Sequence, residues 1–183
     1  KIHMEKKVAI LRGINVGGKR KILMNDLKAL CEKQGFENPL TYIQSGNVIF
    51  EDANGKAHPE LEAKLEKAIL DSYGFEVPVI IRTAEELSNA IKENSFYEEG
   101  KDIGQLHLTF LKEAPSEENK EILLDYKYEP DEYVLKGREV FVYCEGKYHK
   151  SKLSNTLFEK KLKVGATTRN WKTVLKLQEL SQS

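Results

Sequence analysis

Hydrophobic residues recur with two different periods along the chain, and their order predicts strands that alternate with helices. Residues 8–11 form a short apolar run that is typical of a buried strand. The helical period follows, in a segment that Asn25 could cap and that Gly35 could end. Apolar, β-branched and aromatic residues at 40–44 and 48–51 then predict two strands that are joined as a tight hairpin.

The next elements complete a unit of known topology. A second helix is predicted to begin with Pro59 in its first turn and to end at Gly74. Residues 75–83 follow as a strand, and Thr83 with Glu86 forms a capping box for a linking helix. The resulting order β-α-β-β-α-β is that of a ferredoxin-like, split βαβ sandwich.

The second half of the chain repeats most of this order. Its predicted elements are a strand at 106–111, a helix at 116–126, strands at 133–135 and 139–145, a helix at 155–164 and a last helix that begins near Thr167 or Thr168. We therefore predict an α+β fold of two ferredoxin-like halves, 4–98 and 104–183, with a boundary within 95–104. The second half is predicted to be imperfect, because it ends in a helix instead of a fourth strand.

Composition narrows the class of protein. The chain has 183 residues, of which 40% are hydrophobic and 32% are charged, and this balance is typical of a globular protein. No apolar run approaches the roughly 20 residues that a membrane-spanning helix needs, and no signal peptide is recognisable. We therefore expect a cytoplasmic protein with no membrane partner. Lys1 to His3, ahead of Met4, are interpreted as residues left by cloning.

The cysteines and histidines show no metal-binding pattern. Cys31 and Cys144 lie in apolar-periodic segments without metal-ligand spacing, which indicates buried, reduced thiols. The four histidines are scattered along the chain. The sequence therefore predicts no metal site, and the cofactor, if there is one, stays unknown.

The formal net charge of +0 conceals two segments of opposite sign. Carboxylates dominate from residue 98 to 132, whereas cationic side chains dominate from 147 to 176. Such asymmetry indicates an anionic partner. It is equally compatible with a basic segment that docks on the acidic segment of the same chain, and both interpretations stay open.

A glycine-rich basic loop, residues 12–21, leads from the first strand towards the first helix. Gly17 and Gly18 permit backbone angles with positive φ, and cationic side chains follow directly. Exposed N–H groups beside a helix start, together with cations, form an anion site. Residues 13–19 match the first seven positions of G-x-x-x-x-G-K-[ST], but Arg20 replaces the Mg²⁺-binding hydroxyl, which disfavours a nucleotide-hydrolysing loop. The alternative is a packing turn with solvated lysines.

The split βαβ order predicts what lies beside this loop. The first two strands of such a unit run in the same direction, so loop 12–21 and turn 44–47 emerge at one end of the sheet. The segment Thr167–Trp171, predicted as the first turn of the last helix, adds an arginine and an amide. The candidate ligand-binding residues are Arg12, Asn15, Gly17, Gly18, Lys19, Gln44, Ser45, Asn47, Arg169 and Asn170. Simple turn chemistry is the alternative for the hairpin residues, and pairing with a carboxylate is the alternative for Arg169.

Four segments together resemble a known family. They read RGINVGGK near the start, TYIQSGNVIF at 41–50, HLTFL at 107–111 and ATTRNWKTVLKL at 166–177. In this combination the chain resembles the bacterial family catalogued as domain of unknown function 1697, from Met4 onward. The resemblance implies a duplicated ferredoxin-like α+β protein whose biochemical activity has not been established. It supplies no catalytic residues.

Three hypotheses about function follow from these observations. The first is a binding module for a phosphate-bearing ligand, either a nucleotide or nucleic acid, at the glycine-rich basic loop. The second is an enzyme that acts on a phosphorylated small molecule, with Lys19, Arg12 or Arg169 stabilising the developing charge. No pair of nucleophile and base is recognisable, so catalytic residues stay unknown. The third is a protein-interaction or assembly domain, and the oligomeric state stays open.

Overall fold

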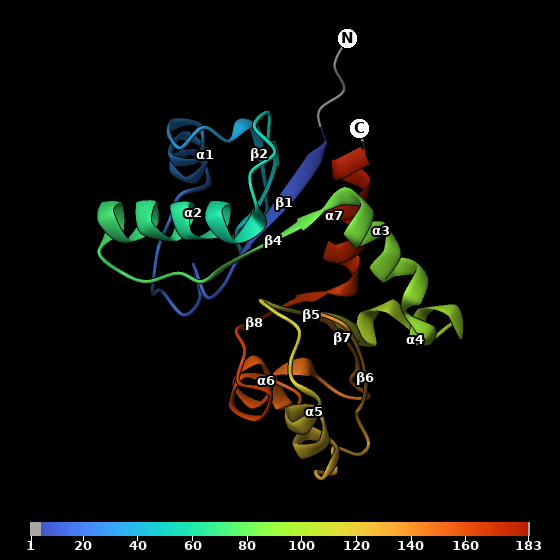
Figure 1. Ribbon diagram of the computed structural model, residues 1–183. Coiled ribbons are helices and arrows are strands. Elements are labelled where there is room, and N and C mark those ends of the chain that lie inside the picture. Colours follow the sequence, from blue (N-terminus) through green and yellow to red (C-terminus); the bar gives the residue numbers. More distant parts are fainter. Residues whose placement is uncertain (1–4, 183) are drawn as a thin grey trace. The chain divides into compact units, whose positions relative to one another are not determined.

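The computed structural model describes residues 5–182, whose elements belong to two units, each built on a four-stranded antiparallel sheet (Figure 1). The N-terminal unit takes the chain up to Ser88 together with the segment from Lys176 onward, and the C-terminal unit takes residues 89–175. The boundary within 95–104 stays a prediction. The interpretation of Lys1 to His3 as cloning residues lies outside the described range.

The N-terminal unit has the order of elements that the hydrophobic pattern predicts. Its elements are β1 (Lys6–Leu11), α1 (Met24–Lys33), β2 (Glu37–Tyr42), β3 (Asn47–Glu51), α2 (His58–Tyr73) and β4 (Val79–Thr83). The strand order is β2-β3-β1-β4, and all neighbouring strands are antiparallel. Because β1 and β2 both run antiparallel to β3, they run in the same direction. The ferredoxin-like topology is confirmed.

Alternate residues of these strands pack against the two helices. Ala9 and Leu11 of β1 and Phe50 of β3 belong to one buried cluster with Leu27 of α1 and Leu65 of α2. The period of two in strands and of about 3.6 in helices brings one apolar face of each element to this cluster. The core therefore holds the ends of the sheet, and the loops that leave them, in fixed positions.

The start of α1 differs from the prediction, whereas both ends of α2 agree with it. Asn25 is the second residue of α1 and does not cap it, because Leu23 occupies the N-cap position in an extended conformation. The glycine-rich loop is therefore separated from the helix start. Pro59 lies in the first turn of α2, and Gly74 ends that helix in a left-handed conformation, φ 78°.

The C-terminal unit repeats the same topology. Its elements are β5 (Leu106–Leu111), α5 (Glu117–Leu124), β6 (Glu132–Lys136), β7 (Glu139–Tyr143), α6 (Asn155–Leu162) and β8 (Ala166–Asn170), with 3-10 turns at Ile103–Gln105 and Tyr148–Lys150. The strand order β6-β7-β5-β8 is equivalent to that of the first sheet, and all neighbouring strands are antiparallel.

The strand β8 corrects the expectation that a helix replaces the fourth strand. Thr167 pairs with Phe110 and Thr168 with Thr109, so residues read as the start of a helix lie in the ladder. The hydroxyls of Thr109 and Thr168 are 2.7 Å apart. Threonine suits a helix start and a pleated strand alike, and here pairing with β5 decides between them. The second half is therefore a complete ferredoxin-like unit.

The register shows how closely the halves correspond. Val8 of β1 pairs with Arg82 of β4, and Leu108 of β5 pairs with Arg169 of β8. Both arginines are buried, at 0% and 8% exposure. Each donates from Nη1 to the carbonyl oxygen of the residue before it, at 3.2 and 3.1 Å respectively. The internal duplication thus includes a buried arginine at the second-to-last position of the fourth strand of each half.

Three further helices complete the fold. They are α3 (Ala84–Glu93), α4 (Ser95–Glu98) and α7 (Trp171–Gln182), of which α3 and α7 each cross the limit between the units. The capping box before α3 is confirmed: the N–H of Thr83 donates to Glu86 Oε1, and the N–H of Glu86 donates to Thr83 Oγ1, both at 3.0 Å. Within residues 5–182, none of the helices has the length and apolar character needed to cross a membrane.

Candidate functional site

The loop 12–21 and the turn 44–47 lie side by side in the N-terminal unit, as the topology predicts. The N–H of Leu11, the last residue of β1, donates to the carbonyl of Gly46 at 2.9 Å. The two segments leave the sheet at the same end because β1 and β2 run in the same direction. We call these two segments together the rim.

Asn15 joins the two segments of the rim. Its Nδ2 donates to the carbonyls of Ile22 at 3.0 Å and Gln44 at 2.8 Å, and its Oδ1 accepts from the N–H of Ile22 at 2.9 Å. The N–H of Arg12 is also used inside the protein, by the carbonyl of Pro78 at 3.0 Å. Several polar groups of the rim therefore hold its shape.

Residues 15–21 form a short projecting turn, which we call the basic finger. Val16 and Lys19 make an isolated bridge, and the N–H of Lys19 donates to the carbonyl of Val16 at 3.0 Å. Gly17 and Gly18 between them have φ of 59° and 72°, as a type I′ turn requires. A Cβ at either glycine would meet nothing within 4 Å. Backbone conformation, and not packing, therefore requires glycine here.

The basic finger carries its charge on the outside. Lys19, Arg20 and Lys21 are exposed. Residues 8–25 contain four cationic side chains and no carboxylate, and the neighbouring strands and turn, residues 41–50, contain no charged residue. These two segments therefore supply no negative charge to neutralise the finger, whose own field favours anions.

The hairpin turn is fixed from the core side. Gly46 has a φ of 88°, and a Cβ at this position would lie 2.6 Å from Ile14 Cδ1. Here the close approach of a core side chain requires glycine. Asn47 is fully buried, and its Nδ2 donates to the carbonyl of Tyr42 at 2.9 Å and to Ser45 Oγ at 3.1 Å. Asn47 therefore stabilises the turn from within.

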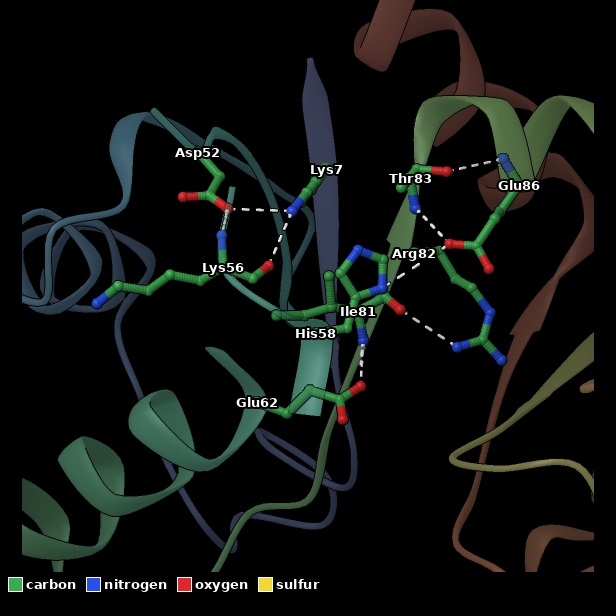
Figure 2. A network of polar contacts seen from close by, with 9 residues as sticks. All are labelled: Lys7, Asp52, Lys56, His58, Glu62, Ile81, Arg82, Thr83 and Glu86. Carbon is green, nitrogen blue, oxygen red and sulfur yellow. Dashed lines mark hydrogen bonds and ion pairs between the residues drawn. The ribbon is translucent and has the colours of Figure 1, made fainter. Parts of the chain in front are cut away.

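A polar network occupies the opposite end of the same sheet (Figure 2). Lys7 Nζ lies 3.0 Å from Asp52 Oδ2, and the two side chains are only 8% and 6% exposed. Lys7 also donates to the carbonyl of Lys56 at 3.3 Å, and the N–H of Lys56 donates to Asp52 at 2.8 Å. Burial raises the pKa of Asp52, but hydrogen bonds and the charge of Lys7 outweigh it, so the pKa lies below its ordinary value.

The other carboxylates of Figure 2 bind backbone groups of β4 or cap the helix after it. Glu62 Oε2 accepts from the N–H of Ile81 at 2.8 Å. Glu86, the capping residue of α3, also lies 3.8 Å from His58 Nδ1. Glu62 therefore provides a hydrogen-bond partner for a backbone N–H at the edge of β4, and Glu86 provides one at the start of α3. Both carboxylates have structural roles.

Arg169 and Asn170 belong to the C-terminal unit, whereas the rim belongs to the N-terminal unit. Burial lowers the pKa of Arg169 to about 10. Asn170 is exposed, and its Oδ1 accepts from the N–H of Thr173 at 2.8 Å, which caps α7. The arginine thus lies in a strand and not in the first turn of the last helix, and the side chain of Asn170 caps that helix.

The acidic and basic segments lie in the same unit and meet in part. The N-terminal turn of α5 carries Glu117 and Glu118, and the last turn of α6 carries Lys160 and Lys161. The two helices are neighbours, and Asn119 Nδ2 donates to the carbonyl of Leu162 at 3.2 Å. This arrangement favours contact between the segments within one chain.

The thiols and the most perturbed histidine are held in their neutral forms. Burial, with a smaller effect of Glu32, raises the pKa of Cys31 to about 12. Cys144 is also buried, and burial raises its pKa. Burial lowers the pKa of His107 to about 4, and its ring lies 4.5 Å from that of Tyr148. The described residues hold no group of three or more potential His, Cys, Asp or Glu metal ligands.

Sequence reasoning missed the buried charges. Three of them, Lys7, Asp52 and Arg82, lie in or beside apolar runs, and the fourth, Glu62, lies in the helix α2; none was singled out. Arg82 interrupts the strand Val79–Thr83, which is a signal that could have found it. The partner of Lys7 is 45 residues away along the chain, so local pattern gave no indication of that ion pair.

Comparisons with known proteins agree with this architecture. A solved structure described as "conserved bacterial protein SP0830 from Streptococcus pneumoniae" matches with a TM-score of 0.79 and 21% sequence identity, and the match covers 99% of this chain and 100% of that chain. This likeness shows the fold alone. No curated protein matches the chain. A family model described as "Protein of unknown function (DUF1697)" matches residues 4–141, and the chain therefore belongs to that family.

Proposed function

We propose that the N-terminal unit binds a phosphate-bearing ligand through the basic finger, and that nucleic acid is the ligand class that fits best. The observation that carries this proposal is the exposed run of Lys19, Arg20 and Lys21 directly after a glycine turn. Cations that neutralise phosphates supply most of the sequence-independent affinity for nucleic acids.

The shape of the finger supports an extended polyanion over a single nucleotide. Gly17 and Gly18 lie at an exposed tip, and α1 begins only at Met24. A loop that cradles a phosphate places its amides around the anion at the start of a helix. A projecting cationic tip instead suits contact with a phosphate backbone, which presents charge along its length.

The rest of the rim has a supporting role in this proposal. Asn15 and Asn47 use their Nδ2 groups to hold the two segments together, so they position the finger. Gln44 is exposed beside it and is the polar side chain of the turn that we assign to direct contact. Arg12 precedes the finger in the loop, and Ser45 Oγ accepts from Asn47 Nδ2 in the neighbouring turn. Any contribution of Arg169 and Asn170 stays a prediction.

The test is binding of fluorescently labelled single-stranded and duplex oligonucleotides, measured by anisotropy at about 50 mM and about 200 mM salt. The variant is Lys19→Gln/Arg20→Asn/Lys21→Gln, in which asparagine tolerates the left-handed conformation of residue 20, φ 48°. Loss of up to three phosphate contacts should reduce the slope of log K against log salt by about 2 to 3.

A matched control removes the same charge elsewhere on the unit. Lys28→Gln/Lys33→Gln/Lys67→Gln changes three exposed lysines of α1 and α2, and it should keep most of the slope. If the wild-type chain binds no oligonucleotide at about 50 mM salt, or if both triple variants lose affinity equally, the finger is not a nucleic-acid site.

A further inference from the structure

The edges of the two sheets differ in how they are closed. An edge strand presents unpaired N–H and C=O groups that can pair with another chain, and proteins usually block such edges. The strand orders place β2 and β4 at the edges of the first sheet and β6 and β8 at the edges of the second.

Carboxylates block β4 and β8 at corresponding places. Glu66 of α2 accepts from the N–H of Val79 in β4 at 2.9 Å. Glu62, four residues before Glu66, accepts from the N–H of Ile81, which is the next N–H of β4 that points outward. In the second sheet, Glu159 of α6 accepts from the N–H of Ala166 in β8 at 3.2 Å. Four residues earlier, Asn155 accepts from Thr168 Oγ1 at 2.6 Å.

Backbone irregularity blocks β2. Its register against β3 shifts between Glu37 and Leu40, Asn38 has a φ of 47°, and Pro39 removes a donor. Bulges and prolines are common devices that prevent edge pairing.

The fourth edge, β6, has none of these devices among the described residues. Its five residues, 132–136, pair with β7 in unbroken register and include neither proline nor glycine. No side chain of the described residues bonds to its backbone, and Tyr133, Val134 and Leu135 are partly exposed. The strand is therefore regular and open along its outer side.

The sequence of β6 is complementary to itself. It reads Glu-Tyr-Val-Leu-Lys, with exposed ends of opposite charge and an apolar centre. We propose that β6 pairs antiparallel with β6 of a second copy of this chain, about a twofold axis at Val134. In that register Glu132 lies opposite Lys136 of the second copy, twice, and Tyr133 lies opposite Leu135. Opposite charges at facing positions stabilise antiparallel pairs.

The hairpin supports the same register. Lys136 pairs with Glu139 across a two-residue turn whose first position is Gly137, φ 58°. The closing pair of such a hairpin exchanges its hydrogen bonds, and the bonds then alternate along the ladder. The backbone groups of Tyr133 and Leu135 therefore point away from β7. Pairing about Val134 brings these outward groups of the two copies opposite each other.

The predicted dimer is weak and reversible. Pairing of five-residue strands buries much less than the roughly 1,200–2,000 Å² of a stable interface. Self-association should therefore appear only at high protein concentration. We expect sedimentation equilibrium of the full chain, from about 10 µM to about 1 mM, to show a shift from monomer towards dimer.

Charge reversal tests the register. Glu132→Lys places two pairs of like charges opposite each other, as does Lys136→Glu, and each should weaken self-association about tenfold or more. Mixing these two variants should restore association as a heterodimer, and the double variant Glu132→Lys/Lys136→Glu should associate like the wild type. Glu118→Lys, an equal charge change at an exposed position of α5, is the matched control and should have little effect.

Each contrary result overturns the proposal. A wild-type chain that stays monomeric at about 1 mM shows that this edge does not recruit a second copy. Dimerisation that persists unchanged in both single variants shows that another surface is used. Failure of the mixed variants to associate rejects the antiparallel register. Folding of every variant is checked by circular dichroism. Residues 132 and 136 are exposed, but Lys136 Nζ donates to the carbonyl of Glu93 at 3.2 Å, and Lys136→Glu removes this bond.

Discussion

Gly46 and Gly17 show two different reasons for a glycine at the same rim. Gly46 faces Ile14 so closely that a methyl group would overlap with it, whereas the surroundings of Gly17 are open. Both have positive φ. Comparing the two positions therefore separates the cost of packing from the cost of backbone conformation.

We expect Gly46→Ala to lower the free energy of unfolding by more than about 2 kcal/mol, because overpacking adds to the strain of a left-handed alanine. Gly17→Ala should cost only about 1 kcal/mol, from conformation alone. Urea denaturation of both variants measures the difference. Equal losses at the two positions would contradict the packing role of Gly46.

The ion pair of Lys7 and Asp52 should make stability dependent on pH. The pKa of Asp52 is lower in the folded protein than its ordinary value of 3.8. The contribution of Asp52 to the free energy of unfolding is therefore fully present above pH 3.8. It is lost as the pH falls from 3.8 through the pKa that Asp52 has in the folded protein. Acid should destabilise the N-terminal unit partly by protonating this carboxylate.

The variant Asp52→Asn leaves Lys7 buried without its counter-charge and should cost about 3 kcal/mol at pH 7. The difference from the wild type should narrow as the pH falls below about 4. Thermal unfolding followed between pH 7 and pH 3 tests this. A difference that is the same at every pH would show that Asp52 acts through its shape and not its charge.

At the scale of elements, carboxylates on α2 and α6 determine that one edge of each sheet is closed. Glu62 is 3% exposed and serves the N–H of Ile81. A charged acceptor of this kind protects an amide that would otherwise be buried without a partner or open to another strand.

Hydrogen exchange of the Ile81 amide measures this protection directly. Glu62→Leu removes the acceptor and should speed exchange, with a loss of stability of about 1–3 kcal/mol. Glu62→Gln keeps a carbonyl acceptor and should fall between that variant and the wild type. Exchange at Ile81 that is unaffected by Glu62→Leu would mean that the hydrogen bond contributes nothing to the edge.

At the scale of the molecule, the two proposed surfaces belong to different units. The basic finger lies in the N-terminal unit, and β6 lies in the C-terminal unit. Binding of an anion and pairing of two chains therefore use separate residues, and variants at one surface should leave the other intact.

We expect Glu132→Lys to keep the oligonucleotide affinity of the wild type when both are measured well below the concentration at which dimers form. The triple variant of the finger should keep the concentration dependence of sedimentation. Anisotropy and sedimentation of both proteins test this. Loss of both properties in a single variant would indicate that the two surfaces depend on each other.

Sequence patterns of neighbouring residues determined most of the helices and strands. The apolar run at 8–11, the helix between Pro59 and Gly74 and the capping box at Thr83 depend on residues close together in the chain, so the sequence alone determined them. The family match covers residues 4–141, which include three of the four segments that carried the resemblance. Topology then placed loop 12–21 beside turn 44–47, because the order of elements fixes which strands run in the same direction.

Only the tertiary structure decided between local alternatives. Thr167 to Asn170 suit either a helix start or a strand, and pairing with β5 made them a strand. Asn15 has an amide suited to a ligand, yet the carbonyl of Gln44, which folding brings close, accepts from it within the chain. Lys7 is buried because Asp52 lies beside it. In each case the stability of the observed conformation depends on a contact between residues that are distant in the chain. A local sequence pattern does not show which distant residues meet.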